Sequence, residues 1–169
     1  MNKILLTWYG ITDYRASLGF ERGGDGPVLG ALKSEHYELV LVLGYLNTAK
    51  AELPDYSISE VLTGLDVANS PDAQRRFVDE TANTPPAHRH YVAWLKHHLA
   101  DAGITTQVQF HSIPLSDLND SNGIYKAAHR LHWFWDRSYS QPRPAGSAHT
   151  ERIRFPGYSR CKSQRFPPS

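Results

Sequence analysis

The stretch YELVLVLGYL, residues 37–46, decides the fold, because it places five Leu or Val residues in a row. Strands with one solvent-exposed face alternate apolar and polar residues, whereas a continuous apolar run is typical of a strand buried on both faces. Strands of that kind belong to parallel sheets that helices cover. The run therefore predicts the central strand of an α/β sheet.

Two further strands are predicted on either side of this run along the chain. Residues 3–8, KILLTW, read as a first strand. In TTQVQFHSI, residues 105–113, Val108 and Phe110 alternate with polar side chains, which predicts a third strand with one wetter face, ended by a turn at Pro114. Helical patterns with capping residues separate and follow the strands, over residues 26–33, 57–65, 70–81, 84–102 and onward from Asp120 or Ser121. The predicted fold is an open, mainly parallel, Rossmann-like sheet with flanking helices, incomplete at its C-terminal end.

Burial is predicted for one stripe on each of the two longest helices. On the helix over residues 84–102 the stripe holds Tyr91, Leu95, Leu99 and Ala102; on the last helix it holds Ile124, Ala127, Ala128, Leu131 and Trp135.

Length and composition point to one folded domain. The chain has 169 residues, of which 40% are hydrophobic and 21% charged, and no run approaches the roughly 18 apolar residues of a membrane span. The single Cys161 forms no internal disulfide. A cytoplasmic location without a membrane partner is therefore predicted.

The C-terminal segment differs in composition from the rest. From Arg137 onward there are seven Lys or Arg, one acid and five of the 11 Pro, and Ile153 is the sole Ile, Leu or Val. We therefore divide the chain into a domain over residues 1–136 and a disordered basic tail over residues 137–169. The tail could contact nucleic acid through its cations. The favoured interpretation is that it is remodelled or out-of-frame sequence attached to a truncated domain.

Polar residues follow the first strand at the edge where open α/β sheets bind ligands. Gly10 would allow close backbone approach, hydroxyls and a cation could contact phosphate, and a carboxylate could accept from a ribose hydroxyl. The candidate ligand-binding residues in this loop are Gly10, Thr12, Asp13, Arg15 and Ser17. Their spacing matches neither a dinucleotide fingerprint nor a P-loop.

A second polar loop follows the third strand and adds Asn119 and Asp120 to the candidate ligand site. An ordinary helix N-cap would need the same residue types, so capping is the competing interpretation.

Catalytic and metal motifs are weak. His88, His90, His97 and His98 crowd one helix without the spacing of a zinc site, which favours a solvated helix face. No nucleophile elbow is present, and Cys161 has no neighbouring base. Neither a catalytic residue, a metal nor a cofactor is predicted.

Four segments together carry a resemblance to a known family: ILLTWYGITDYRASLG, GPVLGAL, VDETANTPPAH and LNDSNGIYKAA. They resemble the amino-terminal region of sigma-54-interacting, RNA-repair-regulator-like bacterial proteins, whose sensing domain is similar to the CRISPR-associated Rossmann-type (CARF) fold. The resemblance extends from Lys3 to Trp135. The chain then departs from the pattern, because DRSYSQPRPAGSAHTERIRF stands where a further strand and a Ser/Thr-Gly-rich ligand loop would follow.

The resemblance implies a nucleotide- or RNA-end-sensing regulatory domain of a sigma-54-type transcription regulator, here stand-alone or truncated. It would place ligand contacts on the five residues of the first loop. The expected partners are that ligand and a second copy in a homodimer. The alternative is a small α/β enzyme acting on a nucleotide or phosphoester, with His111 as general base near Asp13 and Asn119.

Overall fold

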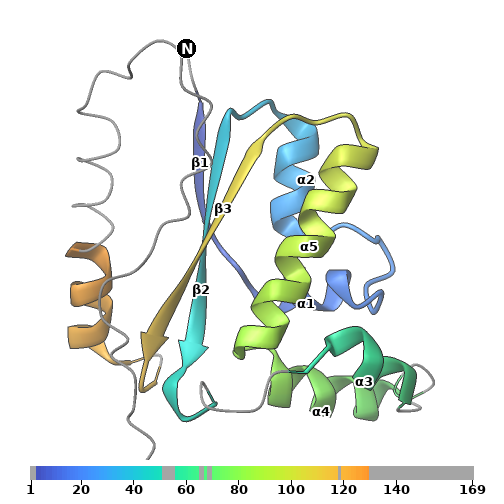
Figure 1. The fold of residues 1–169 in the computed structure, drawn as a ribbon, viewed down its shortest axis with the longest axis vertical. Helices are drawn as coiled ribbons and strands as arrows, with labels where there is room; N and C mark the ends of the chain where they lie inside the picture. Colours follow the sequence, from blue (N-terminus) through green and yellow to red (C-terminus); the bar gives the residue numbers. More distant parts are fainter. Residues whose placement is uncertain (1–2, 51–55, 65–66, 68–69, 118, 130–169) are drawn as a thin grey trace, which may run out of the picture.

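Three parallel strands form the sheet of this computed structural model, which describes residues 3–50, 56–64, 67, 70–117 and 119–129. The strands are β1 (Ile4–Trp8), β2 (Leu39–Asn47) and β3 (Gln107–Leu115), in the order β1-β2-β3 (Figure 1). The helical elements are α1 (Ile11–Ser17), α2 (Pro27–Ser34), the 3-10 turn η1 (Thr48–Lys50), α3 (Ile58–Gly64), α4 (Pro71–Thr81) and α5 (Pro85–Asp101), and residues 121–129 are also helical. The predicted α/β class with an open parallel sheet is confirmed.

The central strand is buried on both faces, as its continuous apolar run predicted. Val40 and Val42 lie in the larger core, against α1, α2 and α5. Leu41 and Leu43 point to the opposite face, where they cluster with Ile113 and Leu115 of β3. Helix 121–129 lies on this second face, on the other side of the sheet from α1, α2 and α5 (Figure 1).

Two helices begin where their capping residues predicted. Ser70 and Thr84 are the N-caps of α4 and α5, and each side-chain oxygen accepts a hydrogen bond from the backbone N–H three residues later. A proline follows each cap at the first helical position, where a missing N–H costs no helical hydrogen bond. Gly103 ends α5 with a φ of 68°, a value that favours glycine.

Three details differ from the sequence predictions. Pro114 does not turn the chain but lies within β3, which tolerates proline because β3 is an edge strand of the described sheet. Ala102 is exposed, because α5 ends at Asp101. On helix 121–129, Ala127 packs against the second-face cluster, but Ile124 and Ala128 are exposed. The predicted tail, 137–169, and the inward-facing positions Leu131 and Trp135 lie outside the described residues.

Among the described residues, no helix combines the length with the apolar character that a bilayer span needs.

We expect Thr84→Ala to lower the free energy of unfolding by about 1–2 kcal/mol. The fully buried Thr84 hydroxyl accepts from Ala87 N and donates to the Thr81 carbonyl at 2.6 Å, so the variant loses both bonds. Urea denaturation measures the change. Thr84→Ser keeps the hydroxyl and should recover most of the loss; equal losses in the two variants would contradict a capping role.

Candidate ligand-binding site

The segment predicted to be a polar ligand loop after β1 is mostly helix. Gly10 is the N-cap of α1, and its carbonyl accepts from Tyr14 N at 3.0 Å. The predicted loop therefore shrinks to two residues, Tyr9 and Gly10, between β1 and α1. Its polar residues are spread around a short helix instead of lining one loop.

Asp13 is the buried centre of this segment, with 3% of its surface exposed. Its Oδ2 accepts from Gly10 N at 3.2 Å, and its Oδ1 accepts from Val28 N at 2.9 Å. The carboxylate thus satisfies backbone donors at the N-termini of both α1 and α2. Burial raises the pKa of Asp13 above its usual range, and the two hydrogen bonds oppose that shift. A Cβ at Gly26 would lie 2.6 Å from Oδ1, so this junction requires glycine.

The other predicted residues of α1 do not converge on a common site. Arg15 Nε donates to the Glu21 carboxylate, and the two form an ion pair. Ser17 is buried and donates to the Tyr14 carbonyl at 2.7 Å. Thr12 is exposed on the surface of the helix.

Asp120 lies at the N-terminus of helix 121–129, as the capping interpretation predicted. Its Oδ1 accepts from Gly123 N at 2.8 Å and its Oδ2 from Ser116 Oγ at 3.2 Å. The bond from Gly123 is the main reason that the pKa of Asp120 lies below its usual range. The neighbouring Asn119 is exposed. Both residues follow β3, whereas Gly10 and Asp13 follow β1, and β2 lies between these strands.

A pocket lies elsewhere, between α3 and the first turns of α5, near the carboxyl edge of the sheet (Figure 1). This α3–α5 pocket has a volume of about 510 Å³ and is lined by Tyr56, Ser57, Ile58, Glu60, Pro86, Arg89 and His90. None of the predicted ligand-binding residues lines it. His90 connects it to α1, because its Nε2 donates to the Ser17 carbonyl at 3.0 Å.

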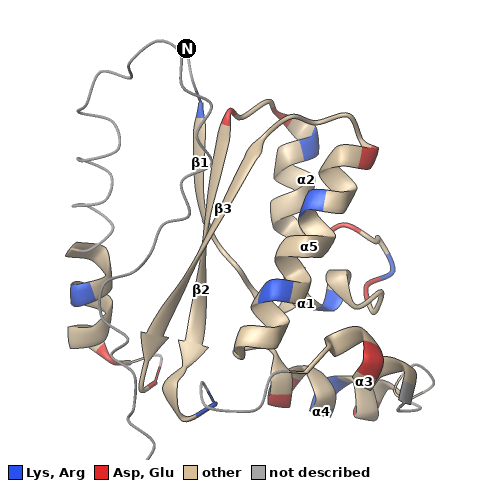
Figure 2. Ribbon diagram, viewed as in Figure 1, with Lys and Arg blue, Asp and Glu red and all other residues tan. Residues whose placement is uncertain are grey.

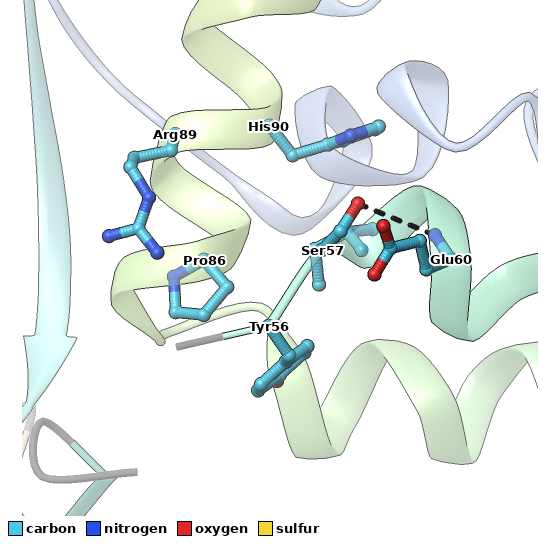
Figure 3. Close-up of a pocket in the computed structure, with 7 residues that line it drawn as sticks. Tyr56, Ser57, Glu60, Pro86, Arg89 and His90 are labelled. Atoms are coloured by element: carbon cyan, nitrogen blue, oxygen red, sulfur yellow. Dashed lines mark hydrogen bonds between the residues drawn. The ribbon is translucent and has the colours of Figure 1, made fainter. Parts of the chain in front are cut away.

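Arg89 and His90 leave α5 in different directions, with His90 turned toward α1 (Figure 3). Both lie near the N-terminal end of the 17-residue α5, where the helix dipole favours negative charge. Glu60 and Ser57 lie across the pocket, and Glu60 N donates to Ser57 Oγ at 3.4 Å. The pocket therefore combines a cation, a carboxylate, a hydroxyl and the Tyr56 ring.

The charged residues near the carboxyl edge of the sheet belong to helices and loops, not to strands. The three strands contain no Lys, Arg, Asp or Glu, and Figure 2 shows their ribbons tan except where the chain enters β1 and β2. Acidic and basic residues both occur on the helices and loops that flank the sheet (Figure 2). Arg89 is the Lys or Arg residue that lines the α3–α5 pocket.

His88, one residue before Arg89, points into the core instead of the solvent, so the prediction of a solvated histidine face is wrong for it. Its ring lies 5.3 Å from that of Tyr9 and 4.9 Å from that of Phe110, between centroids. Its Nδ1 is 2.8 Å from Ser112 Oγ, and Nε2 is buried without a hydrogen-bond partner among the described residues. Burial lowers the pKa of His88 to about 4.

The enzymatic alternative pairs His111 with Asp13, but these two residues lie on opposite faces of the sheet. His111 pairs in register with Leu43, and strand alternation places it on the second face, whereas Asp13 packs on the face covered by α1. Within the described ranges, no three His, Cys, Asp or Glu residues gather as metal ligands would. No family model matches the chain, and neither a curated protein nor a solved structure matches it.

Proposed function

We propose that this chain is a nucleotide- or RNA-end-sensing domain that binds a phosphate-bearing ligand in the α3–α5 pocket. The resemblance described above suggests that such a domain controls a sigma-54-type transcription regulator. The observation that carries the proposal is that Arg89, Tyr56 and Glu60 line one pocket, which lies near the carboxyl edge of a parallel sheet. Ligands of open α/β folds bind at this edge.

Each class of group in the pocket has a counterpart in a nucleotide. The Arg89 guanidinium offers planar donors to a phosphate, near the positive end of the α5 dipole. The Tyr56 ring offers a stacking surface for a base. Glu60 and Ser57 accept hydrogen bonds from ribose hydroxyls or base N–H groups. The volume of about 510 Å³ lies within the range of small-ligand sites.

The pocket also explains how binding could reach the rest of the fold. His90 lines the pocket and holds the C-terminal end of α1 through the Ser17 carbonyl. Asp13, on the same helix, holds the N-terminus of α2. A ligand that displaces His90 would therefore act on the α1–α2 pair, which supports a sensing role.

Isothermal titration with short RNAs tests the proposal. One RNA sequence should be used with a 2′,3′-cyclic phosphate, a 3′-phosphate or a 3′-hydroxyl end, and cyclic oligoadenylates should be titrated separately. We expect heat with at least one phosphate-ended ligand and none with the 3′-hydroxyl RNA. A folded chain that gives no heat with any of them would contradict the proposal.

We expect Arg89→Ala to weaken binding of that ligand about 10- to 100-fold, because a hydrogen bond to a charged group contributes about 1.5–3 kcal/mol. Arg76→Ala is the matched control, since Arg76 is exposed on α4 and does not line the pocket. The control removes the same charge and should change the affinity little. Equal weakening by both variants would indicate general electrostatic attraction and would overturn the placement of the ligand.

A further inference from the structure

Among the described residues, the second face of the sheet is covered over β2 and β3, whereas its β1 side chains Leu6 and Trp8 are exposed. Leu6 pairs in register with Leu41, and Trp8 pairs with Leu43. Leu41 and Leu43 are each 5% exposed, whereas Leu6 is 62% and Trp8 54% exposed. The apolar surface of one face thus continues from buried residues of β2 onto exposed residues of β1.

The position of helix 121–129 explains why β2 and β3, but not β1, are covered on the second face. It begins after β3 and runs back along the second face (Figure 1). Ala127 packs against the cluster of Leu41, Leu43, Ile113 and Leu115. Neither Leu6 nor Trp8 belongs to that cluster. In the described part of the chain, β1 is also an edge strand, with β2 on one side of it alone.

The sequence that continues from this helix is strongly apolar. Residues 131–135 read LHWFW, so four of five positions hold Leu, Trp or Phe. Adjacent strands lie about 4.8 Å apart, so the distance from β2 to β1 is small. Five residues span up to about 17 Å when extended, which is enough to cross from the covered part of the face to the open part.

We propose that residues 131–135 pack over Leu6 and Trp8 and complete the cover of the second face. The segment follows directly from an element that lies on that face, and it carries the aromatic side chains that an exposed Leu and Trp would bury. The surface is thus an intramolecular docking site for this segment.

Disulfide trapping in the full-length chain tests the contact. The background variant is Cys161→Ser, which removes the single native thiol. Leu6→Cys is combined in turn with Leu131→Cys, Trp133→Cys, Phe134→Cys and Trp135→Cys. Thr12→Cys is the matched control, because Thr12 is exposed on α1, which covers the opposite face. Mass spectrometry and non-reducing gels after mild oxidation separate intramolecular from intermolecular disulfides.

We expect at least one Leu6 pair to form an intramolecular disulfide about tenfold faster than the same partner with Thr12, because packing raises the effective concentration of the two thiols. Equal rates for Leu6 and Thr12 would show a segment that does not dock and would overturn the proposal. Predominantly intermolecular disulfides from Leu6 would assign the surface to a second copy and would overturn it as well. Circular dichroism of each variant confirms that the compared chains are folded.

Discussion

Asp13→Ala should lower the free energy of unfolding by about 2–4 kcal/mol, because it leaves two backbone N–H groups without an acceptor and each buried unsatisfied group costs about 1–3 kcal/mol. The donors are Gly10 N and Val28 N, at the starts of α1 and α2. The carboxylate is 3% exposed, so water cannot easily replace it. Urea denaturation at neutral pH measures the loss.

Asp13→Asn separates hydrogen bonding from packing at this position. The amide has nearly the same shape, but its NH₂ group cannot accept, so one of the two bonds is lost and the loss should be intermediate. Asp25→Asn is the control for charge, because Asp25 is exposed and pairs with Lys33 at 2.8 Å on the surface. Surface pairs contribute about 0–1 kcal/mol. If Asp13→Ala cost no more than Asp25→Asn, the carboxylate would not hold the two helices together.

The role of Asp13 shows why the candidate site was difficult to predict. A polar run after an apolar strand indicates either a ligand loop or a helix start, and one of the partners that decides the matter, Val28, lies 15 residues away. Local patterns contain no information about such a contact. The prediction of a ligand contact at Asp13 remains untested, but its carboxylate already has a structural use in the described fold.

Elements defined by local signals were predicted well. The apolar run of β2 and the capped starts of α4 and α5 depend on residues that are neighbours in sequence, and each formed as expected. The α3–α5 pocket depends on segments about 30 residues apart, around Tyr56 and Arg89, and no local pattern joins them.

Three consecutive residues of α5 illustrate the limit for side-chain environments. His88 points into the core, Arg89 lines the pocket and His90 bonds to α1. Successive helical positions turn by about 100°, so periodicity predicts three different directions. The sheet and α1 determine which of these directions faces the core. The number of histidines on the helix therefore did not indicate that His88 is buried.

The buried His88 should make the fold less stable as the pH falls from 7 to 4. The folded pKa is about 4, against an ordinary 6.5, so in this window the unfolded chain binds more protons than the folded chain. The stability contributed by neutral His88 is therefore fully present above about pH 6.5 and lost progressively as the pH falls toward 4. The fall in pKa from 6.5 to about 4 corresponds to about 3 kcal/mol of unfolding free energy.

The surroundings of His88 explain why its pKa is lowered in the folded chain. A protonated imidazole carries two N–H donors, and Nε2 is buried without a hydrogen-bond partner among the described residues. Burial is therefore the dominant effect on the pKa of His88, and a hydrogen bond to the Tyr45 backbone offsets it only in part. The surrounding rings of Tyr9 and Phe110 supply no counter-charge, because a phenol is neutral between about pH 4 and 7 and burial raises the pKa of Tyr9 further. The effect of Asp13 has the opposite sign, since its raised pKa favours the folded state at low pH.

His88→Asn isolates the histidine from these other groups. The variant is less stable at every pH because it leaves a cavity, but it has no imidazole to protonate. The gap in unfolding free energy between wild type and variant, measured by urea denaturation in steps from pH 7 to 4.5, should narrow as the pH falls. Parallel curves over this range would show that His88 does not resist protonation in the folded core. A gap that widens at low pH would mean that the folded chain stabilises the imidazolium, with the hydrogen bond to the Tyr45 backbone outweighing the cost of burial.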